Sequence, residues 1–348
     1  MYTYLALQIG IAFLLDLIIG DPRWFPHPVR LIGKGIELLE MIVRWLFGLE
    51  RFNGTVSAGH VIPDRKRERL AGIVLTGAIV FGTYFITYEI VSFGKYLGQL
   101  WEVAVGAIII YFSLSTRDLL REARGVLHTL KSGRIVQARE NLSRIVGRDT
   151  GELDEEKITR ACVETIAENS VDGIIAPIFY AVLGGPALVM AYKAINTLDS
   201  MVGYKNAEYL HLGWASARFD DIVNFLPARL AAILLPLSAW MCGASFFRSI
   251  RIIKRDGQKH PSPNSGIPEA AVAGALGIRL GGTSSYRGVV TEKPFIGDEE
   301  QKVGIDHIRD TANIVFVASV LSVSTGIIAL LIVSKIIQWL IWAGSVQP

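Results

Sequence analysis

The chain has 348 residues, of which 51% are hydrophobic and 19% are charged, below the roughly 25% charged residues of an average soluble domain. Its mean hydropathy is +0.39, and its apolar residues occur in long blocks separated by charged stretches. This pattern excludes a disordered chain, a collagen and a coiled coil, and it indicates an integral membrane protein. Two cysteines, Cys162 and Cys242, are too few for a disulfide framework or a zinc knuckle.

Six blocks approach the roughly 20 apolar residues that a membrane-spanning helix needs. The first has no basic segment before it and ends in a poor cleavage site, so we expect a retained helix and not a signal peptide. The sequence predicts an all-α, polytopic membrane protein with a single membrane domain and about four to six membrane segments, some of which can be re-entrant. The blocks are residues 4–20, 70–92, 101–115, 173–195, 222–242 and 313–342.

The positive charges are unevenly distributed, although the net charge is only +3. Residues 21–70, 116–170 and 243–310 together hold 29 of the 35 Lys and Arg residues. Cationic loops stay in the cytoplasm, so these three loops are predicted to be cytoplasmic and both termini external. Topology therefore explains the basic charge without a nucleic-acid partner.

Two of the basic loops have local patterns of their own. Residues 116–170 are predicted to be a small helical cytoplasmic insertion, with helices over 117–130 and 135–146 and a third helix that begins near Asp154 and runs through Glu168. Residues 243–310 are predicted to be a cytoplasmic loop, with one helix beginning near Pro268 and little strand signal.

The segment GDPRWFPHPVR follows the first block. Its three prolines end the helix at the membrane surface and stiffen the backbone. That rigidity would hold Asp21, His27 and Arg30 in fixed positions, which suits a functional site. The alternative is an interfacial anchor, with Trp24 and Arg23 at the level of the lipid headgroups.

A row of acidic residues leads into the fourth block. Glu164, Glu168 and Asp172 are spaced four residues apart and would share one helix face, with Asn169 beside them. Like charges at this spacing repel, so a row of carboxylates entering a membrane segment predicts a bound cation, and Mg²⁺ prefers carboxylate, water and phosphate oxygens. The alternative is a solvated helix face on which Arg160 pairs with Glu164.

A third group of polar residues lies against the ends of the fourth and fifth blocks. Lys and Arg suit phosphate oxygens, and the adjacent acids Asp220 and Asp221 suit Mg²⁺. A loop without a function would not need charged groups beside the ends of both membrane blocks, so we expect a functional site. The alternative is ordinary charge pairing, for example of Arg218 with Asp221. The candidate residues are Lys193, Asn196, Asp199, Lys205, Asn206, Arg218, Asp220, Asp221, Asn224 and Arg229.

The fourth group is the segment DGQKHPSPNSGIPEAA. Pro268 suits the first turn of a helix whose cap lies near Ser265, and small residues follow that allow close backbone packing. Free backbone amides at a helix start bind anions, and neighbouring polar side chains could add donors. The alternative is a capped turn that leads into a helix. The candidate residues are His260, Ser262, Asn264, Ser265 and Glu269.

Four strings together resemble one family, the CobD/CbiB proteins of cobalamin biosynthesis (adenosylcobinamide-phosphate synthases). They occur in the family's order and cover most of the chain from residue 15 to 282. Residues 50–70 and the C-terminal stretch match only in general character. The strings are DLIIGDPRWFPHPVRLIGKGIELLE, GRDTGELDEEKITRACVETIAENSVDGIIAPIFYAVLGGP, YKAINTLDSMVGYKNAEYLHLGWASARFDDIVNFLPARLAA and DGQKHPSPNSGIPEAAVAGALGIRLGG.

The resemblance implies an ATP-dependent acid–amine ligase of the cell membrane. Such enzymes join the free carboxylate of adenosylcobyric acid, a corrinoid, to aminopropanol or its phosphate as an amide. Because a carboxylate is a poor electrophile, ATP must activate it, for example as an acyl phosphate, and Mg²⁺ would neutralise the phosphates. The implied partners are these substrates, membrane lipid and other enzymes of the cobalamin pathway.

The resemblance indicates which positions are functional, but it says less about the role of each one. The expected Mg²⁺ ligands are Glu164, Glu168, Asp172, Asp220 and Asp221. The expected clamps for phosphate or carboxylate are Lys193, Lys205, Arg218 and Arg229. The catalytic candidates are Asp199 and either His27 or His260 as a base toward the amine. The remaining candidates for binding substrate or ATP are Asp21, Arg30, Asn169, Asn196, Asn206, Asn224, Ser262, Asn264, Ser265 and Glu269.

One conflict concerns the side of the membrane. ATP is inside the cell, but a simple count of crossings places residues 196–221 outside. A turn at Gly184-Gly185-Pro186 could make the fourth block a re-entrant hairpin, which is tolerated where backbone lines a polar cavity. The fifth block, which contains Pro227 and Pro236, could do likewise. All four groups would then face one cytoplasmic pocket, and the last basic loop would remain inside.

Two other functions compete with a ligase. A transporter for an anionic solute would also have broken helices with intramembrane charge, but the polar groups lie mainly at segment ends and no inverted repeat is visible. The other is a membrane regulator without turnover. Conservative substitution of Asp220 or Glu168 should abolish activity in an enzyme but cost only stability in a scaffold.

Overall fold

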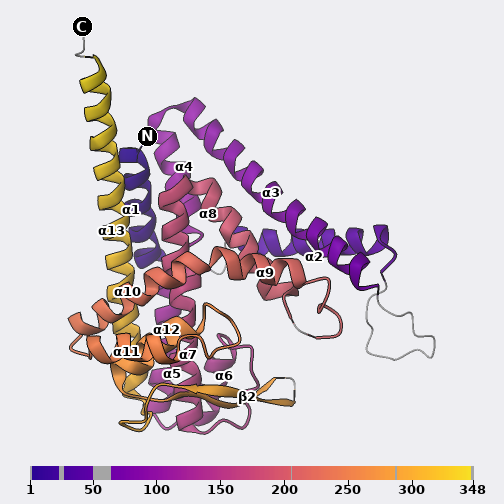
Figure 1. Cartoon of the computed structure of the whole chain (residues 1–348), viewed down its shortest axis with the longest axis vertical. Helices are drawn as coiled ribbons and strands as arrows, with labels where there is room; N and C mark the ends of the chain where they lie inside the picture. Colours follow the sequence, from indigo (N-terminus) through magenta and orange to yellow (C-terminus); the bar gives the residue numbers. More distant parts are fainter. Residues whose placement is uncertain (1, 23–26, 50–63, 205, 287, 346–348) are drawn as a thin grey trace. The chain divides into compact units, whose positions relative to one another are not determined.

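The computed structural model describes residues 2–22, 27–49, 64–204, 206–286 and 288–345 (Figure 1). Within them the chain is almost entirely helical, and five helical segments are long and apolar enough to cross a membrane, or six if α9 and α10 form one span. The predicted class, an all-α polytopic membrane protein, is therefore confirmed.

The elements follow one another in this order along the described residues: α1 (Tyr2–Ile19), α2 (Pro28–Leu46), α3 (Arg65–Leu97), α4 (Gln99–Tyr111), α5 (Thr116–Lys131), α6 (Ile135–Ser143), α7 (Glu155–Ser170), the π-helix η1 (Val171–Ile175), α8 (Ala176–Val202), α9 (Trp214–Val223), α10 (Phe225–Met241), α11 (Phe246–Asp256), α12 (Gly266–Leu276), β1 (Leu280–Tyr286), β2 (Val289–Ile296) and α13 (Asp306–Ser345).

The predicted membrane blocks overlap α1, α3, α4, α8, α10 and α13. The interruption expected in the fourth block is present, because Gly184 and Gly185 leave helical dihedral angles and Pro186 follows them. Gly185 has φ 68°, a conformation that glycine adopts more readily than other residues. The re-entrant path and the side of the membrane stay predictions.

The chain divides into two compact units, a subdivision that the sequence did not predict. Unit 1 comprises residues 1–12, 21–113 and 180–223. Unit 2 comprises residues 13–20, 114–179 and 224–348.

The core of unit 1 is built by α2, α3 and the C-terminal half of α8. Ile36 of α2, Leu75 of α3 and Leu198 of α8 are among its buried side chains. Gly72 of α3 makes a close approach possible, since a Cβ there would lie 2.0 Å from the carbonyl oxygen of Leu212. The turn before α9 therefore packs directly against the α3 backbone.

At the centre of unit 2 lies α12, whose eleven residues are all buried. It packs against α7, α10 and α11, while α13 packs along α5, α7 and α10 (Figure 1). The small residues predicted to permit close packing do so: a Cβ at Gly274 would lie 2.7 Å from the carbonyl oxygen of Arg248.

The end of α1 and the start of α5 cap one another within unit 2. The Asp16 carboxylate is fully buried and accepts the backbone N–H of Thr116 at 3.0 Å. In return, the Arg117 guanidinium donates to the carbonyl oxygens of Leu17, at 2.7 Å, and Ile18. Each helix thus supplies the side chain that satisfies unpaired backbone groups of the other.

The helices predicted within residues 116–170 are present as α5, α6 and α7, with Asp154 as the N-cap of α7, and the cytoplasmic side of this insertion stays a prediction. The helix predicted near Pro268 is present as α12, but the rest of residues 243–310 is not the predicted loop, because it also holds α11 and the antiparallel β1–β2 hairpin. The sequence of β1, LGGTSSY, has no alternating apolar pattern. Its pairing depends on β2 and on polar contacts with distant residues.

Candidate functional site

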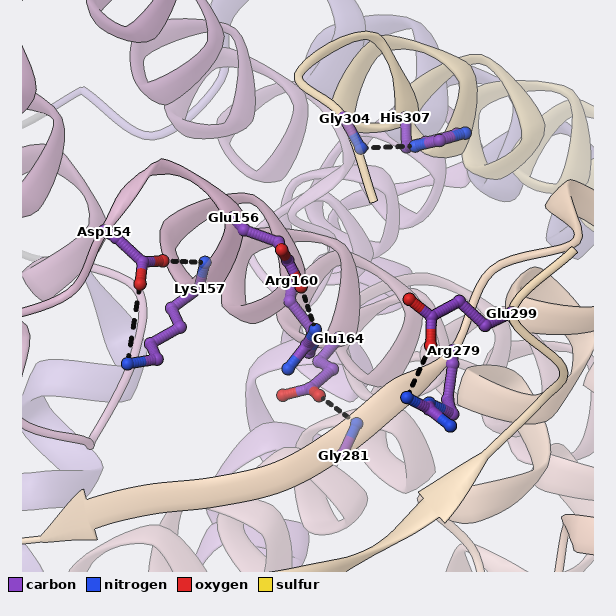
Figure 2. A network of polar contacts seen from close by, with 10 residues as sticks. All are labelled: Asp154, Glu156, Lys157, Arg160, Glu164, Arg279, Gly281, Glu299, Gly304 and His307. Carbon is purple, nitrogen blue, oxygen red and sulfur yellow. Dashed lines mark hydrogen bonds and ion pairs between the residues drawn. The ribbon is translucent and has the colours of Figure 1, made fainter. Parts of the chain in front are cut away.

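The first turns of α7 are held by a helix cap and an ion pair. Asp154 accepts the backbone N–H of Lys157 at 2.8 Å, and this bond lowers the pKa of Asp154. One turn further on, Arg160 pairs with Glu156 and not with Glu164, which was the alternative considered from sequence (Figure 2). Glu164 is therefore available for contacts of a different kind.

Glu164 is 2% exposed and joins α7 to the hairpin. One carboxylate oxygen accepts the backbone N–H of Gly281 at 2.7 Å, and the other lies 2.6 Å from the Arg148 guanidinium (Figure 2 shows the first contact). Burial would lower the pKa of Arg148, but the Glu164 carboxylate outweighs it and the pKa is raised. Arg148 and Glu164 thus form a buried ion pair.

A second set of contacts fastens the hairpin to the loop before α7. Arg148 donates to the Ser284 hydroxyl at 3.3 Å. The neighbouring Asp149 carboxylate accepts the Ser285 hydroxyl at 2.7 Å and the Gly288 N–H at 2.8 Å. These bonds, with the Glu164–Gly281 bond, hold β1 and the hairpin turn against α7.

Glu269, in the first turn of α12, is 2% exposed and faces this same cluster. Burial, followed by the charges of Glu164 and Glu168, raises the pKa of Glu269 well above its ordinary value. The cations Lys293 and Arg148 oppose this rise only in part. Protonation of Glu269 would leave two carboxylates opposite two cations, which is a balanced arrangement.

Lys293 of β2 and His260 complete the cluster. Burial would lower the pKa of Lys293, but Glu269 and further anionic groups raise it overall, so the ammonium form is favoured. Burial, and next the charge of Lys293, lower the pKa of His260, so its neutral form is favoured. The cluster therefore combines a fixed cation with two groups that favour the uncharged state.

The bonding of His260 also indicates which nitrogen carries its proton. Nδ1 accepts the backbone N–H of Ser262 at 3.1 Å, so the proton of the neutral ring lies on Nε2. Nε2 is buried and makes no hydrogen bond to any described residue. This geometry suits His260 as a hydrogen-bond donor to a ligand, whereas the base role stays a prediction.

The segment before α12 brings together several residues named from sequence. The Arg229 guanidinium of α10 donates to the Asn264 side-chain oxygen at 2.8 Å. The Ser262 hydroxyl oxygen accepts the N–H groups of Asn264 and Ser265, at 3.3 and 3.4 Å. Ser265 is the N-cap of α12 without a side-chain capping bond, and Asn224 is buried just before α10. The anion site expected here has fewer free donors than predicted. The Arg229 guanidinium and the backbone N–H groups of Asn264 and Ser265 already donate hydrogen bonds within the protein.

The π-helix η1 alters the predicted alignment of Glu164, Glu168 and Asp172 on one helix face. Asp172 lies in η1, whose wider turn moves it out of the α-helical register of Glu164 and Glu168. Asn169 donates to the Thr165 carbonyl oxygen at 3.0 Å. No three His, Cys, Asp or Glu residues among those described come together as a metal-binding group. The carboxylates expected from sequence to bind Mg²⁺ stay predictions.

In unit 1 the side chains of Asp21 and His27 lie close together. His27 is the N-cap of α2: its Nδ1 accepts the Val29 N–H at 3.3 Å, while its Nε2 lies 3.4 Å from an Asp21 carboxylate oxygen. The ring packs edge-on against Phe112, with centroids 5.3 Å apart. Arg30, in the first turn of α2, is exposed.

The third predicted group also belongs largely to unit 1. Lys193, Asn196 and Asp199 lie half-buried on α8, and Asp220 and Asp221 lie half-buried on α9. Arg218 is exposed and lies 3.9 Å from Asp221, as the charge-pairing alternative expected. Asn206 accepts the Tyr209 N–H at 3.0 Å, and Lys205 is outside the described residues.

A cavity of about 600 Å³ in unit 2 contains none of the predicted site residues. Arg248, on its wall, donates to the carbonyl oxygens of Gly274 and Ala275, and Gln301 donates to that of Leu276. These donors satisfy carbonyl oxygens at the end of α12.

Sequence reasoning missed Arg148, Asp149 and Lys293. The first two lie in a string that resembles the family, but no helical spacing links them to Glu164 or to the hairpin. Lys293 lies outside every motif, and only the β1–β2 pairing brings it to the cluster. A sequence signal for it would have required recognition of the hairpin.

Comparison with known proteins identifies similar chains. The family model described as CobD/Cbib protein matches residues 9–315. The chain is 48% identical over 290 residues to the cobalamin biosynthesis protein CobD of Pelobacter propionicus, covering 83% of this chain and 84% of that protein. It is 44% identical to CobD of Clostridium perfringens (96% and 100% covered) and 43% identical to CbiB of Salmonella choleraesuis (92% and 95%). No solved structure matches.

Proposed function

From the membership of this chain in the CobD/CbiB family, we propose that it is an enzyme of cobalamin biosynthesis that joins adenosylcobyric acid to aminopropanol or its phosphate with ATP. The relatives carry names from this pathway, which supports the general role. The specific ligation is our proposal, and it is argued from the chemistry of the site.

The observation that carries the proposal is the buried cluster of unit 2. Amide formation from a carboxylate requires an anionic acid and an anionic nucleotide to approach each other, so the site must supply fixed positive charge. Lys293 supplies it, because Arg148 is already paired with Glu164, and burial strengthens the electrostatic effect of Lys293. The cluster also contains Glu269, which favours its neutral form.

The proposed reaction has two steps. A carboxylate oxygen of the acid attacks the terminal phosphorus of ATP, and the bond from that phosphorus to ADP breaks. The amine nitrogen then attacks the acyl carbon, phosphate leaves, and the amine loses a proton. Lys293 would neutralise the phosphoryl oxygens, while the Nε2–H of His260 and the neutral Glu269 would donate hydrogen bonds to developing negative charge.

Magnesium fits this site only as part of the Mg-ATP substrate. Mg²⁺ is often bound by one or two carboxylates together with water and substrate phosphates. Glu168, half-buried on α7 and close enough to raise the pKa of Glu269, is the best-placed carboxylate for that role in unit 2. Asp220 and Asp221 stay predictions as ligands.

Reconstitution tests the proposal directly. Purified protein in liposomes receives adenosylcobyric acid, Mg-ATP and either aminopropanol or its phosphate, and the corrinoid mass is followed. We expect a mass gain equal to the amine minus water, only with ATP, and greatly reduced in Glu269→Ala. The matched control is Glu292→Ala on the exposed side of β2, which should retain activity. No product with either amine from folded protein would contradict the proposal.

The break in α8 favours a second candidate function, transport of an anionic solute. Gly184 and Gly185 interrupt a membrane-length helix, as in transporters with discontinuous helices. ATP-independent uptake of a labelled corrinoid into protein-containing liposomes, without a change in its mass, would support transport over ligation.

A further inference from the structure

Helix α2 has two apolar faces, and the described residues of the chain cover one of them. Ile36 and Val43 lie on the inner face and belong to the core of unit 1 with α3 and α8. The outer face carries six large apolar side chains that are between 41% and 79% exposed. They are Leu31, Leu38, Met41, Ile42, Trp45 and Leu46.

Helical geometry groups the outer side chains into one arc. At about 100° per residue, Leu31, Leu38, Ile42 and Trp45 fall within about 60° of one another around the helix. The exposed charged residues Arg30, Lys34 and Glu37 lie along one border of this arc. The outer surface is therefore amphipathic, with an apolar arc beside a charged edge.

The charge on α2 argues against a membrane crossing. Its nineteen residues include Arg30, Lys34, Glu37, Glu40 and Arg44, and among the described helices α2 is not one of those apolar enough to span. Charged side chains within a membrane span are costly. Glu40 and Arg44 are buried and paired with each other, but Arg30, Lys34 and Glu37 are exposed and would face lipid in a crossing.

Connectivity places both ends of α2 at the same membrane surface. Before it comes α1, a possible span that ends at Ile19, and after it comes α3, a possible span that begins at Arg65. If α2 does not cross, the end of α1 and the start of α3 lie on one side. The exposed cations at that start, Arg65, Lys66, Arg67 and Arg69, mark it as the cytoplasmic side.

The end of α2 also lies next to these cations. A Cβ at Gly48, just after α2, would lie 3.2 Å from the Arg67 guanidinium. The apolar arc is thus continuous with the basic start of a possible span. This charge complements the anionic lipids of a cytoplasmic leaflet.

We propose that α2 lies in the plane of the membrane, at the boundary between headgroups and acyl chains, and that its outer face binds an anionic lipid leaflet. Leu31, Leu38, Ile42 and Trp45 insert among the acyl chains. Lys34 on the charged edge meets the lipid phosphates. His27, the N-cap of α2, and the adjacent Asp21 are thereby held at the membrane surface.

Spin labels on the full-length protein test this arrangement. In a background lacking Cys162 and Cys242, single cysteines replace Leu31, Leu38 or Trp45, all on the exposed face, with Glu37→Cys as the matched control on the charged edge. The protein is placed in vesicles of phosphatidylethanolamine and phosphatidylglycerol. Relaxation by oxygen and by a water-soluble nickel complex reports the depth of each label.

Leu31 and Trp45 are fourteen positions apart, or about 21 Å along a helix. An in-plane helix predicts nearly equal, shallow depths for both labels, with oxygen favoured over nickel, and more nickel relaxation at Glu37. Replacing phosphatidylglycerol with phosphatidylcholine should bring the labels closer to the water.

Three results would overturn the proposal. A depth difference near the full helix length would show that α2 crosses the bilayer. Strong nickel relaxation at all positions would show a face in water. Weak relaxation by both reagents would show that protein, such as a second copy of the chain, covers the arc. None of these results bears on the ligase activity.

Discussion

Buried ionisable residues give unit 2 its most distinctive chemistry. Glu164 has its charge matched by Arg148 and a backbone N–H, whereas the pKa of Glu269 is raised by burial, Glu164 and Glu168 more than Lys293 and Arg148 lower it. Two glutamates on neighbouring helices therefore have opposite environments. Such divergence is typical of sites in which one acid is charged and another holds a proton.

Glu269→Gln should make stability less dependent on pH. Because the pKa of Glu269 is raised, the folded protein holds this proton more tightly than the unfolded chain does. The free energy of unfolding should therefore fall as the pH rises above the ordinary glutamate value of about 4.3, up to the folded pKa. Thermal unfolding in detergent between pH 5 and 8 should show a smaller decline in Tm for the variant. An unchanged decline would contradict the assignment.

Lys293→Gln should weaken nucleotide binding. We expect KM for ATP to rise at least about tenfold, which corresponds to about 1.4 kcal/mol. Its neighbour Glu292 is exposed, so Glu292→Gln should leave KM unchanged. Steady-state kinetics of both variants in liposomes provides the comparison. Equal KM values for wild type and Lys293→Gln would remove Lys293 from the site.

At the scale of elements, a π-helix and a hairpin shape the cluster. The carbonyl oxygen of Gly173, in η1, accepts the N–H of Ser115 at 3.0 Å, and a Cβ at Gly173 would lie 2.2 Å from the Ser115 hydroxyl. The start of α5 is thereby packed against the π-helix. The hairpin covers the acidic face of α7 and delivers Lys293 from a region with no recognisable motif.

Asp149→Ala should loosen the hairpin without unfolding unit 2. The variant loses the hydrogen bonds to Ser285 and Gly288, and one or two kcal/mol corresponds to about a 5- to 30-fold change in opening. Hydrogen exchange should accelerate by that factor at residues 280–296, while α13 should keep its protection. Glu292→Ala, which removes an exposed carboxylate of β2, is the control. Unchanged exchange in the hairpin would show that Asp149 does not secure it.

Helices and their ends could be predicted because they depend on local signals. The cap at Asp154 and the break at Gly184-Gly185 are read from residues next to one another. The hairpin could not be predicted, because β1 has no strand pattern and is held by Glu164 and Asp149, more than a hundred positions away. The pairing of Arg148 with Glu164 could not be predicted either, because only the tertiary fold brings these two side chains together.

At the scale of the whole molecule, the main question is on which side of the membrane residues 196–221 lie. The five possible spans agree with a multi-pass membrane protein, while the cytoplasmic position of residues 196–221 stays a prediction. It matters because ATP is available only on that side. The broken helix α8 provides a physical route to a re-entrant path.

Cysteine labelling can determine that side. In a background lacking Cys162 and Cys242, Tyr209→Cys should resist an impermeant reagent in intact cells and react in inverted vesicles. Tyr96→Cys, near the end of α3 that the predicted topology places outside, and 85% exposed, should show the opposite pattern. Labelling of position 209 in intact cells would count heavily against a cytoplasmic site.

The central claim is that ATP activates the carboxylate that becomes the amide. The most direct test uses adenosylcobyric acid with ¹⁸O in its free carboxylate, reconstituted protein, Mg-ATP and the amine. One carboxylate oxygen leaves with phosphate in the proposed reaction, so each amide formed should yield one ¹⁸O-labelled inorganic phosphate and one ADP. An amide formed without label in phosphate, or no amide at all from folded protein, would contradict the claim.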